Sequence, residues 1–148
     1  MAYTAIDDPS AHFHTMLYTG NGSTNAITND ANAGDLQPDL LWIKTRSHSS
    51  SHRLMDSSRL ASGEATLSLR SEDNAADSDI ANDGMTSLDS DGFTLNGNGS
   101  GGAVNEDTKT YVAWQWKANG GSLTTNDASA TSVGSIDSVY QANTTAGF

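Results

Sequence analysis

The apolar residues of this chain occur in short alternating runs, and no run has the spacing of an amphipathic helix. The clearest run, residues 110–117 (TYVAWQWK), alternates as a strand does, because successive strand side chains point to opposite faces. One face of this strand would carry Val112, Trp114 and Trp116. Their grouping predicts that both tryptophans pack in the core, with Trp116 the one left partly exposed.

Similar runs follow the chain at regular intervals, separated by segments rich in Gly, Asn, Asp and Ser. In residues 85–95 two runs flank an Asp-Ser-Asp-Gly turn, which predicts a hairpin with Gly92 at positive φ. The near-continuous apolar run after Pro38 predicts a central strand covered on both faces. Strands are also expected within residues 13–19, 52–55 and 66–70. The pattern predicts an all-β fold, a single antiparallel β-sandwich of jelly-roll or lectin-like type.

The expected organisation has three parts. Residues 1–12 contain Pro9 and little apolar material, and are expected to form an extended N-terminal arm. Residues 13–120 are expected to form the β-sandwich domain. Residues 121–148 are rich in Ser, Thr, Ala and Asn, and are expected to be a low-complexity arm or the start of a linker to a further domain.

Charge and cysteine content narrow the function. The chain has 18 acidic and 7 basic residues, for a net charge of -11, which disfavours binding to nucleic acid or to an anionic membrane. There is no cysteine, so disulfides and thiolate metal sites are excluded. The sequence shows neither a signal peptide nor an apolar run long enough to insert in a membrane, so we expect synthesis and assembly in a cytoplasm.

The best candidate for a metal site is Asp89-Ser-Asp-Gly92, which has the composition of the start of a calcium loop. A calcium loop of this type ends in a Glu at its twelfth position, and that position is Ser100 when counted from Asp89. A hairpin turn is therefore the preferred interpretation. Calcium is the one cofactor that Asp89 and Asp91 would suit, and we predict no other.

Other polar clusters have simpler interpretations. His48 and His52 have a zinc-ligand spacing, but they lie in an HSSSH segment without helical pattern or an evident third ligand. The acidic segment 71–84, with Asp73, Asp77, Asp79 and Asp83, is expected to be a solvated loop. No G-x-S-x-G elbow and no suitably placed pair of Glu residues is present, so we expect no catalytic residues and no enzyme activity.

Four strings taken together resemble a family. They are residues 17–24 (LYTGNGST), 36–44 (LQPDLLWIK), 87–95 (SLDSDGFTL) and 110–118 (TYVAWQWKA). In order and spacing they resemble a poorly characterised family of virion structural proteins of tailed phages, many of which infect marine bacteria. The resemblance spans most of residues 1–120. It implies a β-sandwich on tail fibres, tail-associated adhesins or the capsid surface, and it implies no catalytic residues.

The resemblance and the composition lead to one expectation and two alternatives. The chain is expected to be a homo-oligomeric structural protein of the virion surface, attaching a tail fibre or adhesin to the particle, with copies of itself and other virion proteins as partners. The first alternative is a capsid decoration protein. The second is a carbohydrate-binding module for a host surface glycan, with Trp116 in an aromatic platform.

Overall fold

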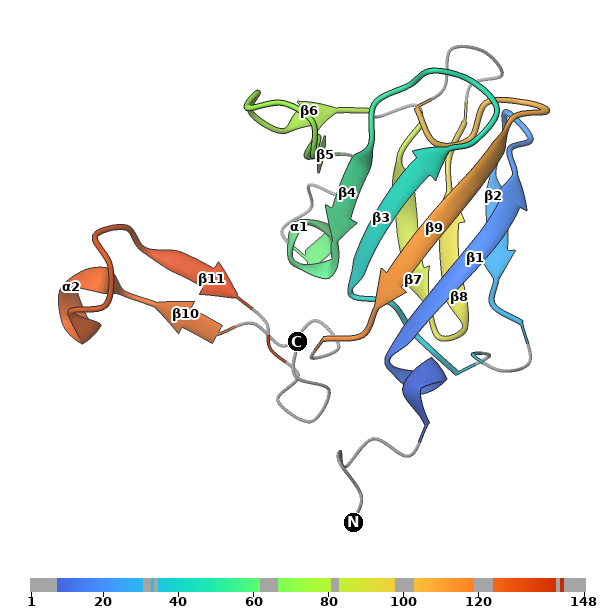
Figure 1. Ribbon diagram of the computed structural model, residues 1–148. Coiled ribbons are helices and arrows are strands. Elements are labelled where there is room, and N and C mark those ends of the chain that lie inside the picture. The colour runs from blue at the N-terminus through green and yellow to red at the C-terminus, as the bar shows by residue number, and fades with distance from the viewer. Residues whose placement is uncertain are drawn as a thin grey trace.

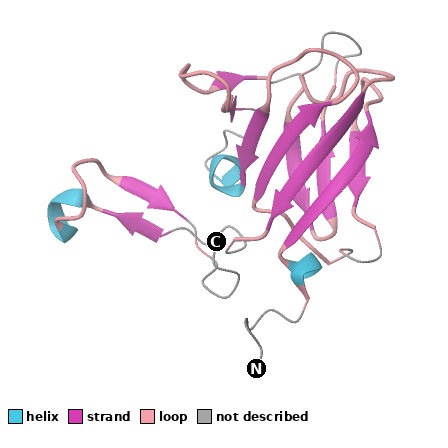
Figure 2. Cartoon of the chain, viewed as in Figure 1, coloured by secondary structure: helices cyan, strands magenta, loops and turns pink. Residues whose placement is uncertain are grey.

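The computed structural model describes residues 8–30, 33, 35–61, 67–80, 83–97, 103–118, 124–140 and 142. Every strand pairing is antiparallel. The strands are β1 (Phe13–Thr19), β2 (Asn25–Thr28), β3 (Leu40–Thr45), β4 (Arg53–Asp56), β5 (Leu67–Ser68), β6 (Ser78–Asp79), β7 (Met85–Asp89), β8 (Gly92–Leu95), β9 (Thr110–Trp116), β10 (Thr124–Asn126) and β11 (Ser138–Tyr140). Helices are short: the 3-10 helix η1 (Pro9–Ala11), α1 (Ser57–Ala61) and α2 (Ala128–Thr131). The prediction of an antiparallel, nearly all-β chain is confirmed (Figure 2).

Two sheets form the centre of the molecule (Figure 1). A four-stranded sheet has the order β1-β9-β3-β4, and a three-stranded sheet behind it has the order β2-β8-β7. The pairings are nested, because β1 pairs with β9 in one sheet and β2 pairs with β8 in the other. Two small two-stranded sheets, β5–β6 and β10–β11, complete the described strands.

The core lies between the two sheets. Tyr18 on β1 stacks on Tyr111 of β9 with ring centroids 5.1 Å apart, and its edge meets Phe93 of β8 at 6.0 Å. Other buried side chains, from both sheets and from the loop before β9, join them: Ile27, Leu41, Ile43, Met55, Met85, Leu88, Leu95, Val104 and Ala113. Each large apolar side chain removed from water in this way contributes roughly 1.5–3 kcal/mol, which makes this layer the main source of stability.

Several predicted strands are confirmed. The predicted strand 13–19 is β1, and the apolar run after Pro38 is β3, a central strand of its sheet. The expectation that β3 is covered on both faces is wrong, because only its inward face, with Leu41 and Ile43, is fully buried. The predicted hairpin is β7–β8, in which Asp89 pairs with Gly92. Gly92 has φ 155°, and a Cβ atom there would lie 2.0 Å from the carbonyl oxygen of Ile27 on β2. Glycine is required because the neighbouring backbone occupies the space of any side chain.

The prediction for β9 is wrong in one respect. The strand alternates as expected, but its buried side chains are Tyr111, Ala113 and Gln115, whereas Trp114 and Trp116 face away from the core. A polar atom does not exclude a side chain from the core when it finds a partner there. The Tyr111 hydroxyl accepts the N–H of Glu106 at 3.0 Å, and Gln115 Nε2 donates to Asn29 Oδ1 at 2.6 Å.

Residues 124–140 form a separate hairpin of β10, α2 and β11. Figure 1 shows it apart from the two packed sheets. Asp127 caps α2 by accepting N–H groups from Ser129 and Ala130. The large apolar side chains of the hairpin are exposed: Val133, Ile136, Val139 and Tyr140.

The predicted N-terminal arm lies mostly outside the described residues, which begin at Asp8, and its last part forms η1. Residues 121–123, 141 and 143–148 of the predicted C-terminal arm also lie outside them. Within the described ranges no helix is long and apolar enough to span a membrane.

Candidate functional site

The tryptophans that the sequence placed in the core instead lie on the outer face of the four-stranded sheet. The strand register aligns them in two rows. Phe13 on β1 lies opposite Trp116 on β9, and in the neighbouring row Trp114 on β9 lies opposite Trp42 on β3. We call Phe13, Trp42, Trp114 and Trp116 the aromatic face.

The rings of the aromatic face contact one another at tilted angles. Trp42 and Trp114 have ring centroids 5.4 Å apart at 60°, and Phe13 and Trp116 have centroids 5.1 Å apart at 50°. These separations lie in the favourable range for aromatic pairs. The three tryptophans are half-buried and Phe13 is 41% exposed, so part of each ring remains accessible to a binding partner.

His52 fixes the orientation of Trp42, in the row that Trp42 forms with Trp114. The indole N–H of Trp42 donates a hydrogen bond of 2.9 Å to Nδ1 of His52, and the two rings are 5.7 Å apart. The hydrogen bond satisfies the polar atom of Trp42 within the protein. What Trp42 presents outward is therefore chiefly aromatic carbon, which binds by dispersion and stacking.

The aromatic face carries little charge in a strongly acidic chain. The outward positions of β1 and β9 hold only aromatic, aliphatic and Thr side chains. On β3 and β4 the outward charged residues are Lys44, whose Nζ donates to the carbonyl of Ser50 at 3.2 Å, and Asp56, which pairs with Arg59. Such a surface suits a partner that is itself apolar or uncharged.

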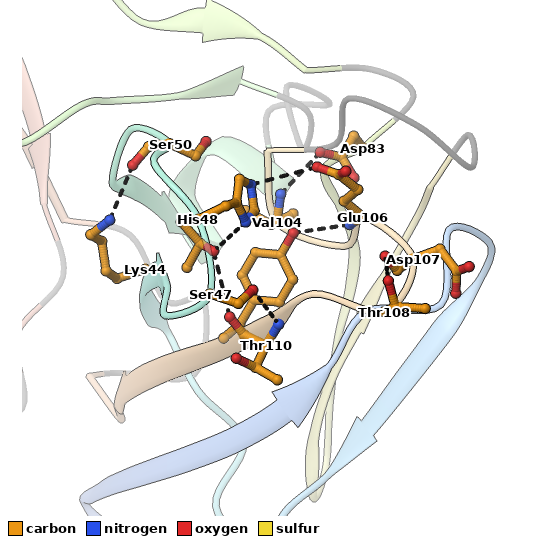
Figure 3. A network of polar contacts seen from close by, with 12 residues as sticks. Lys44, Ser47, His48, Ser50, Asp83, Val104, Glu106, Asp107, Thr108 and Thr110 are labelled. Carbon is orange, nitrogen blue, oxygen red and sulfur yellow. Dashed lines mark hydrogen bonds and ion pairs between the residues drawn. The ribbon is translucent and has the colours of Figure 1, made fainter.

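Apart from the aromatic face, a polar cluster lies in the loops at one end of the two sheets (Figure 3). His48 Nδ1 lies 2.8 Å from the hydroxyl of Thr45, and His48 Nε2 lies 3.5 Å from a carboxylate oxygen of Glu106. The ring of His48 meets Tyr111 edge-on at 6.2 Å. This cluster joins the loop after β3 to the loop before β9, so it fixes the end of the core.

Asp83, expected in a solvated loop, is instead buried beside this cluster. Its Oδ2 accepts the N–H of Val104 at 2.9 Å, and the carbonyl of Val104 accepts the Tyr18 hydroxyl at 2.6 Å. Burial raises the pKa of Asp83 to about 6, and burial also raises the pKa of Tyr111 to about 12. Both shifts follow from packing between the loops and the core.

Asn105 is a structural residue that the sequence did not indicate. It is fully buried, and its Oδ1 accepts from the N–H of Asn21 at 3.1 Å and from Asn25 Nδ2 at 2.9 Å. Its Nδ2 donates to the carbonyls of Ser23 at 2.6 Å and Asn96 at 3.1 Å. One amide thus joins three loops, and no hydrophobic pattern in the sequence could reveal such a contact.

The Asp89-Ser-Asp-Gly92 string forms the hairpin turn that was the preferred interpretation. The carboxylate of Asp89 accepts hydrogen bonds from the hydroxyls of Ser87 at 2.8 Å and Thr94 at 2.7 Å, within its own hairpin. The carbonyl of Asp91 accepts the N–H of Asn29 at 2.8 Å. These contacts give both residues a role in joining β2, β7 and β8.

The remaining polar candidates lie apart. His48 and His52 have different partners, Glu106 and Trp42. In the acidic segment Asp73 pairs with Arg70 at 3.1 Å and Asp77 lies 3.6 Å from Arg59, while Asp79 lies in β6. Across the described ranges, no three His, Asp or Glu side chains gather as a group that could hold a metal ion.

Comparison with known proteins places the chain in a family. No curated protein and no solved structure matches it. A family model described as a domain of unknown function (DUF7483) matches residues 8–148, which is nearly the whole chain. The chain therefore belongs to the DUF7483 family.

Proposed function

We propose that this chain is a structural domain of the tailed-phage virion surface that attaches a tail fibre or adhesin to the particle and works as a homo-oligomer. The observation that carries the proposal is the aromatic face, an apolar sheet surface on a chain with net charge -11. Interfaces between proteins are enriched in aromatic residues and depleted of charge at their centres. The acidic remainder of the surface keeps unrelated contacts from forming.

The resemblance to phage virion proteins supports the same proposal. Its four strings fall on five of the seven strands that build the two packed sheets, all except β2 and β4. They include the end of β1, most of β3, most of the β7–β8 hairpin and all of β9. The resemblance therefore involves the elements that determine the fold as well as the aromatic residues on β3 and β9.

We further propose that the packed sheets form a lectin-like β-sandwich of jelly-roll type. The nested pairings β1–β9 and β2–β8, placed in opposite sheets, are what such wrapping produces. In this arrangement the outer face of one sheet is free to meet a partner while the inner face forms the core.

The 124–140 hairpin supports a role in assembly. A two-stranded hairpin alone is marginally stable in water, and this one exposes Ile136 at 78% and Val133 at 64%. Packing against a neighbouring virion protein would cover these side chains and stabilise the hairpin. Residues 121–148 would then act as the arm that the sequence predicts.

Immunogold electron microscopy of intact phage particles tests the proposal. Label on fibres or at the fibre attachment site is expected, and label spread over the head would instead support capsid decoration. Particles without label, and without this chain in their protein composition, would contradict both. Complementation with a Trp114→Ser/Trp116→Ser chain should reduce its incorporation, whereas Thr86→Ala, an exposed change on β7, should not.

A second candidate function has an observation of its own. Because the tryptophans lie on the outer face, Trp116 and its neighbours could stack on sugar rings, as expected of a carbohydrate-binding module. The measurement is a glycan array followed by NMR titration, with and without calcium. Binding that is lost in Trp116→Ala while the folded state persists would favour this function, and absence of binding to any glycan would count against it.

A further inference from the structure

The two edges of the four-stranded sheet differ in how they are protected. At the β4 edge, Leu54 exchanges backbone hydrogen bonds of 3.0 Å with Leu69, so the segment 67–69 covers that edge. At the opposite edge, β1 pairs only with β9 among the described residues. The edge strands of the second sheet are β2 and β7. Strand β2 is short, with four residues, and β7 has a register shift and ends at Asp89.

Strand β1 lacks the usual protection of an edge. Natural proteins shorten an edge strand, bend it with a bulge, or place Pro or charged residues on it, because open edges pair with other chains. β1 has seven residues, an unbroken register with β9, and neither Pro nor Lys, Arg, Asp or Glu. Among the residues that the structure describes it is an open edge, on which two acidic copies could meet with little charge repulsion.

The register shows which backbone groups are available. Lys117 N donates to His12 O at 2.9 Å, and Gly20 N donates to Lys109 O at 2.8 Å. Hydrogen-bonded pairs alternate along an antiparallel ladder, so even-numbered residues of β1 bond to β9. The N–H and C=O groups of Phe13, Thr15 and Leu17 therefore point to the open edge. The next outward carbonyl, that of Thr19, already accepts from Asn25 Nδ2 at 3.2 Å.

The side chains on the same residues suit a two-fold pairing. Phe13 and Leu17, 41% and 55% exposed, lie at equal distances in sequence from Thr15 on the outer face. An axis at Thr15 would place Phe13 of each copy opposite Leu17 of the second copy. Aromatic and aliphatic side chains opposed across strands stabilise the pairing, and both would lose exposed surface.

We propose that β1 pairs antiparallel with β1 of a second copy, with Thr15 opposite Thr15, so that the four-stranded sheets of two chains join in one continuous sheet. The inference rests on the homo-oligomeric state of the proposed function and specifies its interface. The two aromatic faces then lie on the same side of the joined sheet and form one larger surface.

Sedimentation velocity of the full chain, combined with amide hydrogen exchange, tests the proposal. The expected result is a dimer in which the amides of Phe13, Thr15 and Leu17 are protected as well as those of His14 and Met16. A dimer held only through side chains would leave the odd-numbered amides exchanging, as would a monomer. Either result would overturn the proposal.

Thr15→Pro provides a specific variant. It removes an N–H that points to the open edge and that β9 does not use, so the fold should remain while pairing is blocked. We expect the dimer dissociation constant to rise by at least about tenfold. Thr15→Ala, which keeps the N–H, is the matched control and should remain dimeric. A dimer unaffected by Thr15→Pro would contradict the inference.

A second variant covers the case in which Thr15→Pro fails to fold. Leu17→Lys leaves the backbone unchanged and places a charge opposite Phe13 of the second copy, so it should also shift the chain to monomer.

Immunogold labelling is independent of these results. A monomer that still labels the virion would overturn the edge pairing and the homo-oligomeric state but leave the virion location standing, whereas unlabelled particles with a β1-paired dimer would overturn the virion function alone.

Discussion

Phe13 and Trp116 lie directly opposite each other on β1 and β9, with ring centroids 5.1 Å apart, on the outer face of the four-stranded sheet. On the inner face of the same sheet, Tyr111 of β9 is fully buried. One seven-residue strand thus supplies aromatic residues both to the core and to a surface. The two sets should respond differently to truncation.

Truncation of Trp116 should cost less stability than truncation of a core aromatic residue. Phe93→Ala, at a fully buried position, is expected to lower the free energy of unfolding by about 3–5 kcal/mol. Trp116→Ala, at a half-buried position, should lower it by about 1–2 kcal/mol. Urea denaturation followed by circular dichroism measures both, and equal losses would contradict the outward placement of Trp116.

Asn105→Ala should destabilise the chain by at least about 2 kcal/mol. The change removes the acceptor for Asn21 N and Asn25 Nδ2 and the donor for two loop carbonyls. Thermal unfolding is the measurement, with Asn126→Ala in the exposed hairpin as the control. A loss no larger than in the control would mean that water replaces these hydrogen bonds without cost.

Asp83 should make stability fall as the pH rises. Its pKa is about 6 in the folded state against an ordinary value of 3.8, because burial disfavours its charged form, although the backbone N–H groups of Val104 and Asn105 partly offset this. Between these values the folded state holds more protons than the unfolded chain, so the free energy of unfolding decreases with pH.

The Asp83→Asn variant should lose this pH dependence. Relative to wild type, it should gain about 1–3 kcal/mol between pH 4 and pH 7. Urea titrations at several pH values measure the difference, and Asp107→Asn, an exposed change, is the control. A constant difference between Asp83→Asn and wild type over that range would show that the carboxyl of Asp83 titrates normally.

Gly92→Ala should cost about 1–3 kcal/mol or more, because its Cβ would lie 2.0 Å from the Ile27 carbonyl oxygen and force β2 and β8 apart. Gly134→Ala is the matched control. Gly134 also has positive φ, 75°, but a Cβ atom there would meet nothing within 4 Å beyond its chain neighbours. Its loss should be limited to the backbone term of about 1–2 kcal/mol. If Gly134→Ala is the more destabilising, the contact with Ile27 is not what requires glycine at position 92.

Local patterns predicted much of the fold. β1 was predicted with its observed bounds because its β-forming residues are followed by a Gly-Asn-Gly turn. The β7–β8 hairpin was predicted because Gly92 follows Asp89-Ser-Asp between two short apolar runs, where a tight turn requires glycine. Both features depend on neighbours in sequence, so one sequence contains enough information to identify them.

The candidate site was harder to predict because alternation does not reveal which face of a strand is inside. On β9 the more apolar face, with Val112, Trp114 and Trp116, is the outward one, because the choice depends on partners distant in sequence, such as Asn29 for Gln115. Asn105 illustrates the same limit, since its contacts at Asn21 and Asn25 are about eighty residues away. Such pairings follow from how the two sheets meet.

The pairing of β1 with β9 has a mechanical consequence. Phe13 begins β1 and its partner Trp116 ends β9, so the chain enters and leaves the four-stranded sheet at the same end of adjacent strands. Tension applied through the flanking segments would peel the two strands apart and load their hydrogen bonds one after another, because these bonds run across the strands. Tension along the chain would therefore open the domain from that end, and the load that it withstands would be set by single pairs of hydrogen bonds and not by the whole ladder at once.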